Sequence, residues 1–179
     1  RCDASVVRKS SVLGAGPIVV TAFTSLATGS AAGPFTPQGV DNYDPAATQG
    51  YFVGVDSLSF SLLQLRRVST PGATPTLSAN IGLSVPATAF PINVTAQGGA
   101  VPLDGLDDRL FAAHVRNGRL WTAHNIQVNA TGIGGTTGGR NGTRWYEIGN
   151  LSGTPNLIQS GTIFDNASAN PNSFWIPSV

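Results

Sequence analysis

The sequence predicts an all-β fold of antiparallel strands arranged in propeller-like blades, with a β-sandwich as the alternative. Lys and Glu, two strong helix formers, occur once each in 179 residues, and Met is absent. The 22 Gly and 12 Pro residues, with many Ser, Thr, Asn and Val, are typical of strands joined by tight turns. Turn signals recur about every ten residues, a spacing found in sandwiches and propellers rather than in alternating strands and helices.

Composition excludes several classes of protein. A hydrophobic content of 41% with a net charge of +1 excludes a disordered chain. No apolar run reaches the roughly 18 to 20 residues that a membrane span needs. Arg supplies nine of the ten basic residues and the pI is near 8.2, which is not the electrostatic footprint of a polyanion-binding protein. We therefore expect neither a nucleic-acid partner nor a membrane span.

Short β-branched and aromatic runs predict the strands of the first half of the chain. They lie at 17–26, 51–55, 61–68, 76–85 and 90–96. The intervening residues 27–48 are rich in Pro and Gly and are expected to be irregular. We divide this half into an N-terminal part over 1–48 and a first blade-like unit over 49–100.

The clearest local signal is a hairpin at Asn117-Gly118. This dipeptide accepts the positive φ angles of a type I′ turn, and strand-like runs at 110–116 and 119–128 flank it. A helix over 103–115 is the rival interpretation, and the glycine within that range argues against it.

Further strands are expected at 143–148 and 156–164, after a Gly-rich loop at 132–139. They complete a second blade-like unit over 101–165, and residues 166–179 are expected to begin a further strand. A strand, a Gly-containing turn and a Thr-Pro-x-Leu segment occur in both halves of the chain, at 65–77 and at 145–157. A propeller blade has four strands in about 40 to 50 residues, so this recurrence favours blade-sized repeats.

Several motifs resemble those of uncharacterised secreted bacterial proteins with β-propeller-like repeats. They are the run from Arg109 to Asn125, Arg-Trp-Tyr-Glu-Ile at 144–148, Gln-Ser-Gly-Thr at 159–162 and Phe-Trp-Ile-Pro-Ser at 174–178. The resemblance covers most of the chain from about residue 50 onward and implies no catalytic residue. The Ser-x-Asp-x-Gly-x-Thr-Trp motif of sialidase-type propellers is absent, so glycosidase activity is not carried over.

The pattern Asn-x-Ser/Thr indicates an extracellular or cell-surface address. It occurs at Asn93, Asn129, Asn141, Asn150 and Asn166. In a cell that has the glycosyltransferase for this pattern, we expect sugars at loop positions such as Asn129, Asn141 and Asn150. The single cysteine, Cys2, cannot form an intramolecular disulfide and is expected to be a free thiol.

Metal and cofactor sites are not expected. The only histidines are His114 and His124, and a two-residue loop pairs His114 with Trp121 and Phe111 with His124. Side chains alternate between the faces of a strand, so the two imidazoles point to opposite sides unless a bulge shifts the register. The Gly-rich loop lacks the Lys-Ser/Thr ending of a phosphate-binding loop.

Paired carboxylates are the only enzymatic option with candidates. The candidates are Asp104, Asp107, Asp108, Glu147 and Asp165. Glycoside hydrolysis needs two carboxyl groups roughly 5 to 10 Å apart. We expect the Asp107-Asp108 pair to form a turn with an ion pair to Arg109, and Glu147 to be solvated. Adjacent residues point to opposite faces of a strand, so we also expect Arg66 or Arg67 to lie at a sheet edge or in a buried ion pair, for example with Asp56.

Trp121, Trp145 and Trp175 could form a platform for stacking sugars, with a place in the core as the ordinary alternative. No acid–base constellation is recognisable, which favours a non-enzymatic role over an enzymatic one. The predicted function is an extracellular structural or binding module within a larger or self-associating, even filamentous, surface assembly. Its partners would be copies of itself, other surface proteins or glycans. The alternative is a carbohydrate-active hydrolase that uses paired carboxylates.

Overall fold

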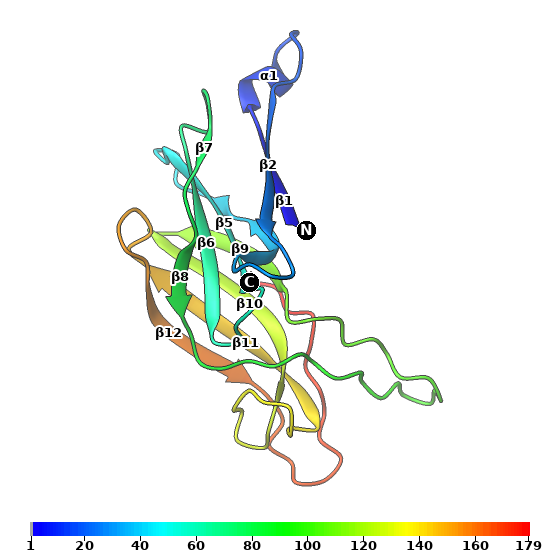
Figure 1. Ribbon diagram of the computed structural model, residues 1–179. Helices are drawn as coiled ribbons and strands as arrows, with labels where there is room; N and C mark the ends of the chain where they lie inside the picture. Colours follow the sequence, from blue (N-terminus) through cyan, green and yellow to red (C-terminus); the bar gives the residue numbers. More distant parts are fainter. Residues whose placement is uncertain (1) are drawn as a thin grey trace.

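The structure is a computed structural model and describes residues 2–179, so residue 1 of the N-terminal part lies outside the described residues. Strands account for 47% of the chain and helix for 3%, and the all-β expectation is confirmed. The strands form two five-stranded sheets and one two-stranded sheet (Figure 1). No helix among residues 2–179 is long and apolar enough to cross a membrane.

The N-terminal segment forms an arm that projects from the body (Figure 1). Strands β1 (Cys2–Val7) and β2 (Val20–Ala27) pair antiparallel, and the short helix α1 (Lys9–Leu13) lies between them. Cys2 is half-buried and carries a free thiol. Neither β1 nor α1 has a strong enough sequence pattern to be expected.

Sheet 1 is built from the first half of the chain. Its strands are β3 (Pro34–Gly39), β5 (Gln49–Asp56), β6 (Leu62–Ser69), β7 (Thr76–Leu77) and β8 (Ile81–Ser84). The order is β3-β5-β6, with β7 and β8 both paired to β6, and all pairs are antiparallel.

Sheet 2 is an antiparallel meander from the second half, with one strand added from the first. Its order is β12 (Asn156–Ile163), β11 (Arg140–Gly149), β10 (Arg119–Val128), β9 (Leu110–Arg116) and β4 (Asp41–Asn42). Strand β4 runs parallel to β9, whereas the other pairs are antiparallel.

The core lies between the two sheets, because alternate residues of each sheet turn toward the other. Sheet 1 contributes Tyr51, Val53, Val55, Leu63, Leu65 and Leu83, and sheet 2 contributes Leu110, Ala113, Val115, Leu120, Tyr146 and Ile148. Two sheets that share one core are consistent with the β-sandwich alternative. Propeller-like blades are not shown by residues 2–179.

The Asn117-Gly118 hairpin is confirmed. The two turn residues have φ angles of 50° and 71°, as a type I′ turn requires. Two other expectations were wrong: residues 27–48 contain β3 and β4, and residues 90–96 form no strand, with only an isolated bridge between Val94 and Leu103. Composition alone could not predict β4, because its partner β9 is distant in sequence.

The turns of the two Thr-Pro-x-Leu segments have the same geometry. Thr70 and Asn150 open them with φ angles of 49° and 53°. The Thr70 hydroxyl donates to the Thr74 carbonyl at 2.7 Å, and the Asn150 amide donates to the Thr154 carbonyl at 2.9 Å. In each turn, the first residue has a left-handed backbone conformation, and its side chain closes the turn by a hydrogen bond to the carbonyl four residues later.

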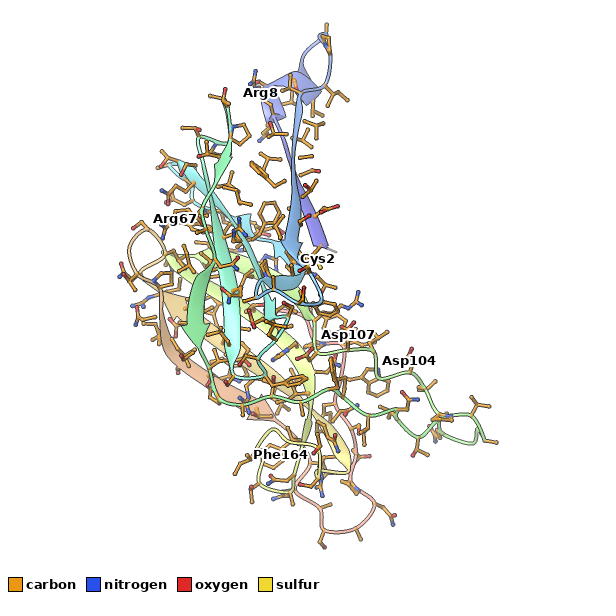
Figure 2. The ribbon with its side chains drawn as sticks, viewed as in Figure 1. Cys2, Arg8, Arg67, Asp104, Asp107 and Phe164 are labelled. Atoms are coloured by element: carbon orange, nitrogen blue, oxygen red, sulfur yellow. The ribbon has the colours of Figure 1, made fainter. Side chains whose placement is uncertain are left out.

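Arg67 ties sheet 1 to the turn between β11 and β12, because its Nε donates to the Leu151 carbonyl at 3.1 Å (Figure 2). Of the alternatives expected for Arg66 and Arg67, the ion pair with Asp56 does not form. The register places Arg66 opposite Phe52, four residues before Asp56 on β5, so neither guanidinium reaches that carboxylate.

Candidate functional site

The outer face of sheet 2, turned away from sheet 1, carries a row of polar and aromatic side chains. Register places His114 on β9 opposite Trp121 on β10, Trp121 opposite Glu147 on β11, and Glu147 opposite Gln159 on β12. These positions alternate with the core residues of the same strands, so the row points away from the core. We call these four residues the outer-face row.

Trp121 and Trp145 form a stacked pair on this face. Their ring centroids are 6.1 Å apart and their planes differ by 28°. Both side chains are half-buried. Gly161, opposite Trp145 on β12, leaves room for the indole, because a Cβ built at that glycine would lie 2.7 Å from the ring. Two of the three expected stacking tryptophans are therefore brought together.

Trp175 lies apart from this pair. It lines a separate cavity of about 420 Å³ together with Asn93 and Pro171. The C-terminal segment that carries Trp175 runs past the C-terminal half of β10 and the N-terminal end of β11. There the Ile176 amide donates to the Asn125 side chain at 3.2 Å, and the Phe174 amide donates to the Asn141 carbonyl at 3.0 Å. The three tryptophans thus do not form a single platform.

Glu147 was expected to be solvated, and this was wrong. Its side chain is only 12% exposed. Gln159 Nε2 donates to Glu147 Oε2 at 2.7 Å, and Arg119 Nε lies 3.8 Å from Glu147 Oε1. These neighbours fix the carboxylate beside Trp121, so the row presents polar atoms at a defined position next to the stacked rings.

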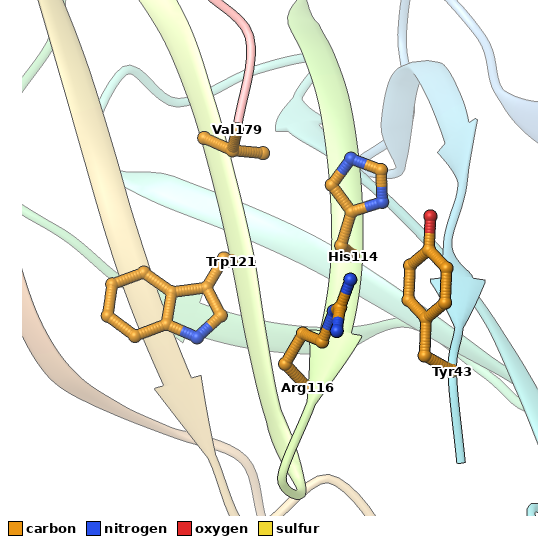
Figure 3. A pocket seen from close by; sticks show the side chains of 5 residues that line it. All are labelled: Tyr43, His114, Arg116, Trp121 and Val179. Carbon is orange, nitrogen blue, oxygen red and sulfur yellow. The ribbon is translucent and has the colours of Figure 1, made fainter.

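A cavity of about 400 Å³ continues the outer-face row toward β4 (Figure 3). It is lined by Tyr43, His114, Arg116, Trp121 and Val179. The Arg116 guanidinium lies 4.3 Å from the centroid of the Tyr43 ring, which is cation–π geometry. Trp121 and Tyr43 form opposite walls, with His114 and Arg116 between them (Figure 3).

Charges on this face nearly cancel. His114 Nδ1 lies 3.6 Å from the Asp41 carboxylate, and Arg119 lies beside Glu147. Arg116 is a further cation on this face, and its guanidinium lies over the Tyr43 ring. A face with paired charges and exposed aromatic rings fits a neutral polyhydroxylated ligand better than a strongly charged one.

His114 on β9 and His124 on β10 point to opposite faces of sheet 2, as expected. They therefore cannot ligate the same metal ion. A bulge shifts the register between Ala123 and His124, and His124 lies opposite Leu110 rather than Phe111. His124 is completely buried on the core side. Among residues 2–179, no group of three or more His, Cys, Asp and Glu side chains could hold a metal ion.

The candidate carboxylates have separate local partners. The ion pair between Asp107 and Arg109 is confirmed at 2.6 Å, and it holds the pKa of Asp107 below its usual value (Figure 2). Asp104 accepts from the Leu106 amide, and Asp165 accepts from the Asn172 amide and side chain. These carboxylates are structural elements of turns.

Asp108 is the exception. It is buried and lines a second cavity together with Asp56, a residue that the sequence had linked to the arginines instead. No local sequence pattern could have paired these two carboxylates, because Asp56 ends β5 of sheet 1 and Asp108 lies in the segment before β9 of sheet 2.

The five Asn-x-Ser/Thr asparagines differ in exposure. Asn93, Asn150 and Asn166 are exposed and Asn129 is half-buried. Asn141 was expected in a loop, and this was wrong: it lies in β11 and is completely buried. Its side-chain amide donates to the Ile92 carbonyl at 2.7 Å and accepts from the Ile92 amide at 2.8 Å.

Comparison with known proteins gives no match: no family model, no curated protein and no solved structure is significantly similar to the chain. A functional conclusion therefore rests on the geometry of the sites.

Proposed function

We propose that the chain is an extracellular binding module whose outer face on sheet 2 binds a neutral carbohydrate. The observation that carries the proposal is the stacked pair of half-buried Trp121 and Trp145, in which Trp145 packs over Gly161. Sugar rings present apolar C–H faces that pack against large aromatic surfaces. Two adjacent indoles in similar orientations fit consecutive sugar units better than they fit a compact charged ligand.

The neighbouring polar groups supply the complementary interactions. Glu147 and Gln159 offer oxygen atoms and an amide beside Trp121, and His114 and Arg116 offer ring and guanidinium N–H groups across the adjoining cavity. A sugar that stacks on the rings would exchange its hydroxyl–water hydrogen bonds for these. The five Asn-x-Ser/Thr patterns and the near absence of Lys and Glu support the extracellular address.

Affinity electrophoresis against a panel of soluble neutral polysaccharides, namely galactomannan, arabinoxylan and hydroxyethyl cellulose, tests the proposal. We expect at least one of them to retard the protein. Trp121→Ala and Trp145→Ala should each weaken that retardation by about tenfold or more, as for other central aromatic contacts. Trp175→Ala removes the same side chain from outside the face and is the matched control.

A further variant tests the positioning of the ring without removing it. Gly161→Val places a side chain where the Trp145 indole lies, so binding should weaken although both tryptophans remain. Equal retardation of the wild type and both Trp→Ala variants would contradict the proposal. Hydrolysis of chromogenic glycosides by the wild type would instead favour the hydrolase alternative.

Association with copies of the same chain is a second candidate, and the free edge of sheet 2 favours it. Within the described residues 2–179, strand β12 pairs with β11 alone, and it contains no charged residue between Asn156 and Ile163. Unpaired, uncharged strand edges are templates for pairing with another chain. A binding face displayed on several linked copies would gain avidity for a repetitive polysaccharide.

A further inference from the structure

A cavity of about 230 Å³ opens beside the turn between β5 and β6, away from the outer-face row. Leu58, Phe60 and Phe90 supply apolar walls, and Asp56 and Asp108 are its charged groups. Its volume is below that of pockets for drug-sized ligands. Any ligand that it takes must therefore be small.

The Asp108 carboxylate has no partner in another described residue. The residue is only 3% exposed. The carboxylate accepts a hydrogen bond from the Asp108 backbone itself, and no hydrogen bond or ion pair joins it to another of residues 2–179. The residue itself is held in place, because His124 Nδ1 donates to the Asp108 backbone carbonyl. A buried carboxylate on a fixed stretch of backbone thus lies at a cavity, with no partner from another described residue.

Asp56 is different because its carboxylate is fully engaged. It accepts hydrogen bonds from the Gly33 amide at 3.1 Å, the Leu58 amide at 3.0 Å and Gln64 Nε2 at 2.7 Å. These bonds fix the wall of the cavity and leave a second negative charge close to the opening. The cavity is therefore anionic.

Within residues 2–179, no cationic side chain forms an ion pair with Asp108. The nearest basic side chain in the sequence, Arg109, is bound to Asp107 through Nε at 2.7 Å and a terminal nitrogen at 2.6 Å. Burial raises the pKa of Asp108 to about 6, and the neighbouring Asp107 charge acts in the same direction. At pH 7.5 the carboxylate is ionised and costs folding free energy, which an added cation would offset.

Two aromatic rings stand at the same cavity. Phe60 and Phe90 meet edge to face with centroids 4.9 Å apart, and they are 44% and 55% exposed. Thr88 holds the Phe60 backbone, because its amide and hydroxyl donate to the Phe60 carbonyl at 2.6 and 2.9 Å. Exposed aromatic faces beside a buried carboxylate attract organic cations through apolar contact and cation–π interaction.

We propose that this cavity is a binding site for a small primary ammonium ion that carries an apolar group. The ammonium group donates to the Asp108 carboxylate, and the apolar group packs against Phe60 and Phe90. The site is separate from the outer-face row, so it does not depend on carbohydrate binding.

Benzylammonium chloride is the probe, titrated at pH 7.5 into the protein and followed by amide chemical shifts in NMR. We expect saturable binding with a dissociation constant on the order of 1 mM, with shifts near Asp108 and Phe90. Benzyl alcohol has nearly the same shape without the charge. It should bind at least about tenfold more weakly, because a charge-assisted hydrogen bond is lost.

Asp108→Asn is the decisive variant, because it removes an unneutralised buried charge and is expected to fold. It should bind benzylammonium at least about tenfold more weakly. Asp104→Asn makes the same charge change at an exposed loop position four residues away, and it should bind like the wild type. Equal affinities of Asp108→Asn and wild type, equal affinities for the alcohol and the ammonium ion, or a lack of saturation would each overturn the proposal.

Discussion

His124 Nε2 accepts a hydrogen bond from the Tyr146 hydroxyl at 3.0 Å in the centre of sheet 2. The other ring nitrogen, Nδ1, donates to the Asp108 carbonyl, so the imidazole is fixed as the neutral Nδ1–H tautomer. Complete burial lowers the pKa of His124 to about 4 and raises the pKa of Tyr146. His124 is therefore a structural residue of the core, and its two hydrogen bonds connect β10 to β11 and to the segment before β9.

We predict that His124 and Asp108 have opposite effects on stability in acid. As the pH falls from 6.5 to 4, His124 becomes protonated in the unfolded chain but stays neutral in the folded chain. This difference lowers the free energy of unfolding by about 3 kcal/mol. As the pH falls from 6 to 3.8, the folded chain protonates Asp108 before the unfolded chain does, which raises stability by about 3 kcal/mol. In the wild type these two contributions nearly cancel.

Asp108→Asn removes the stabilising contribution and leaves that of His124. Urea unfolding between pH 7 and pH 4 should show a steeper loss of stability for this variant than for the wild type. Asp104→Asn, an exposed carboxylate changed in the same way, should follow the wild type. The same slope for all three proteins would show that Asp108 does not titrate as described.

We predict that Tyr146→Phe destabilises the protein by about 1–3 kcal/mol, because it leaves the buried Nε2 of His124 without a donor. The ring volume is preserved, so no cavity is created. Urea unfolding at pH 7 measures the change, and Tyr43→Phe, which removes a hydroxyl from an exposed ring, is the control. Equal unfolding midpoints for the two variants would contradict the proposed role of the hydroxyl.

Local patterns predicted the hairpin of β9 and β10 because one dipeptide sets both its turn and its register. The packing of the two sheets could not be predicted in the same way. Strand β4 joins sheet 2 through Asp41, paired with His114 far along the chain, and such pairing leaves no local signal. The all-β class is a property of composition, whereas the choice between blades and a sandwich depends on these long-range contacts.

The candidate site was predictable only in part. Alternation along β10 and β11 places Trp121 and Trp145 on one face, so their proximity follows from strand geometry. The role of Gly161 does not follow from strand geometry alone, because the register of β11 and β12 shifts near Glu147 and Ile148. A count from the turn therefore misses the residue that lies beneath Trp145. The Asp108 cavity depends on burial by several loops and has no sequence pattern.

We predict that Asn141 carries no glycan when the protein is secreted from a eukaryotic cell, although it lies in an acceptor pattern. Its amide is buried and bonded to Ile92, whereas Asn93, Asn150 and Asn166 are exposed. Peptide mapping by mass spectrometry should find sugars among the exposed three and an unmodified Asn141 in the folded protein. A glycan at Asn141 in protein that unfolds cooperatively would contradict the burial of this strand.

The last prediction concerns the free edge of sheet 2. Ile158 and Ile163 on β12 are 42% and 57% exposed, and no Lys or Pro lies on this strand to discourage pairing. The edge strands of sheet 1 are better protected, since β3 contains two prolines and β7 and β8 are short. We therefore expect copies of the chain to associate through β12 at micromolar concentration.

Light scattering coupled to size exclusion should detect these oligomers in the wild type. Ile158→Lys and Ile163→Lys introduce a charge at the edge and should shift the protein toward the monomer. Ile133→Lys makes the same change in the exposed Gly-rich loop, at a position 62% exposed, and should leave the oligomers unchanged. Since exposed apolar side chains in general promote association, this control separates pairing at the strand edge from nonspecific contact. A monomeric wild type with a single sharp unfolding transition would contradict the prediction and leave a sandwich that functions alone.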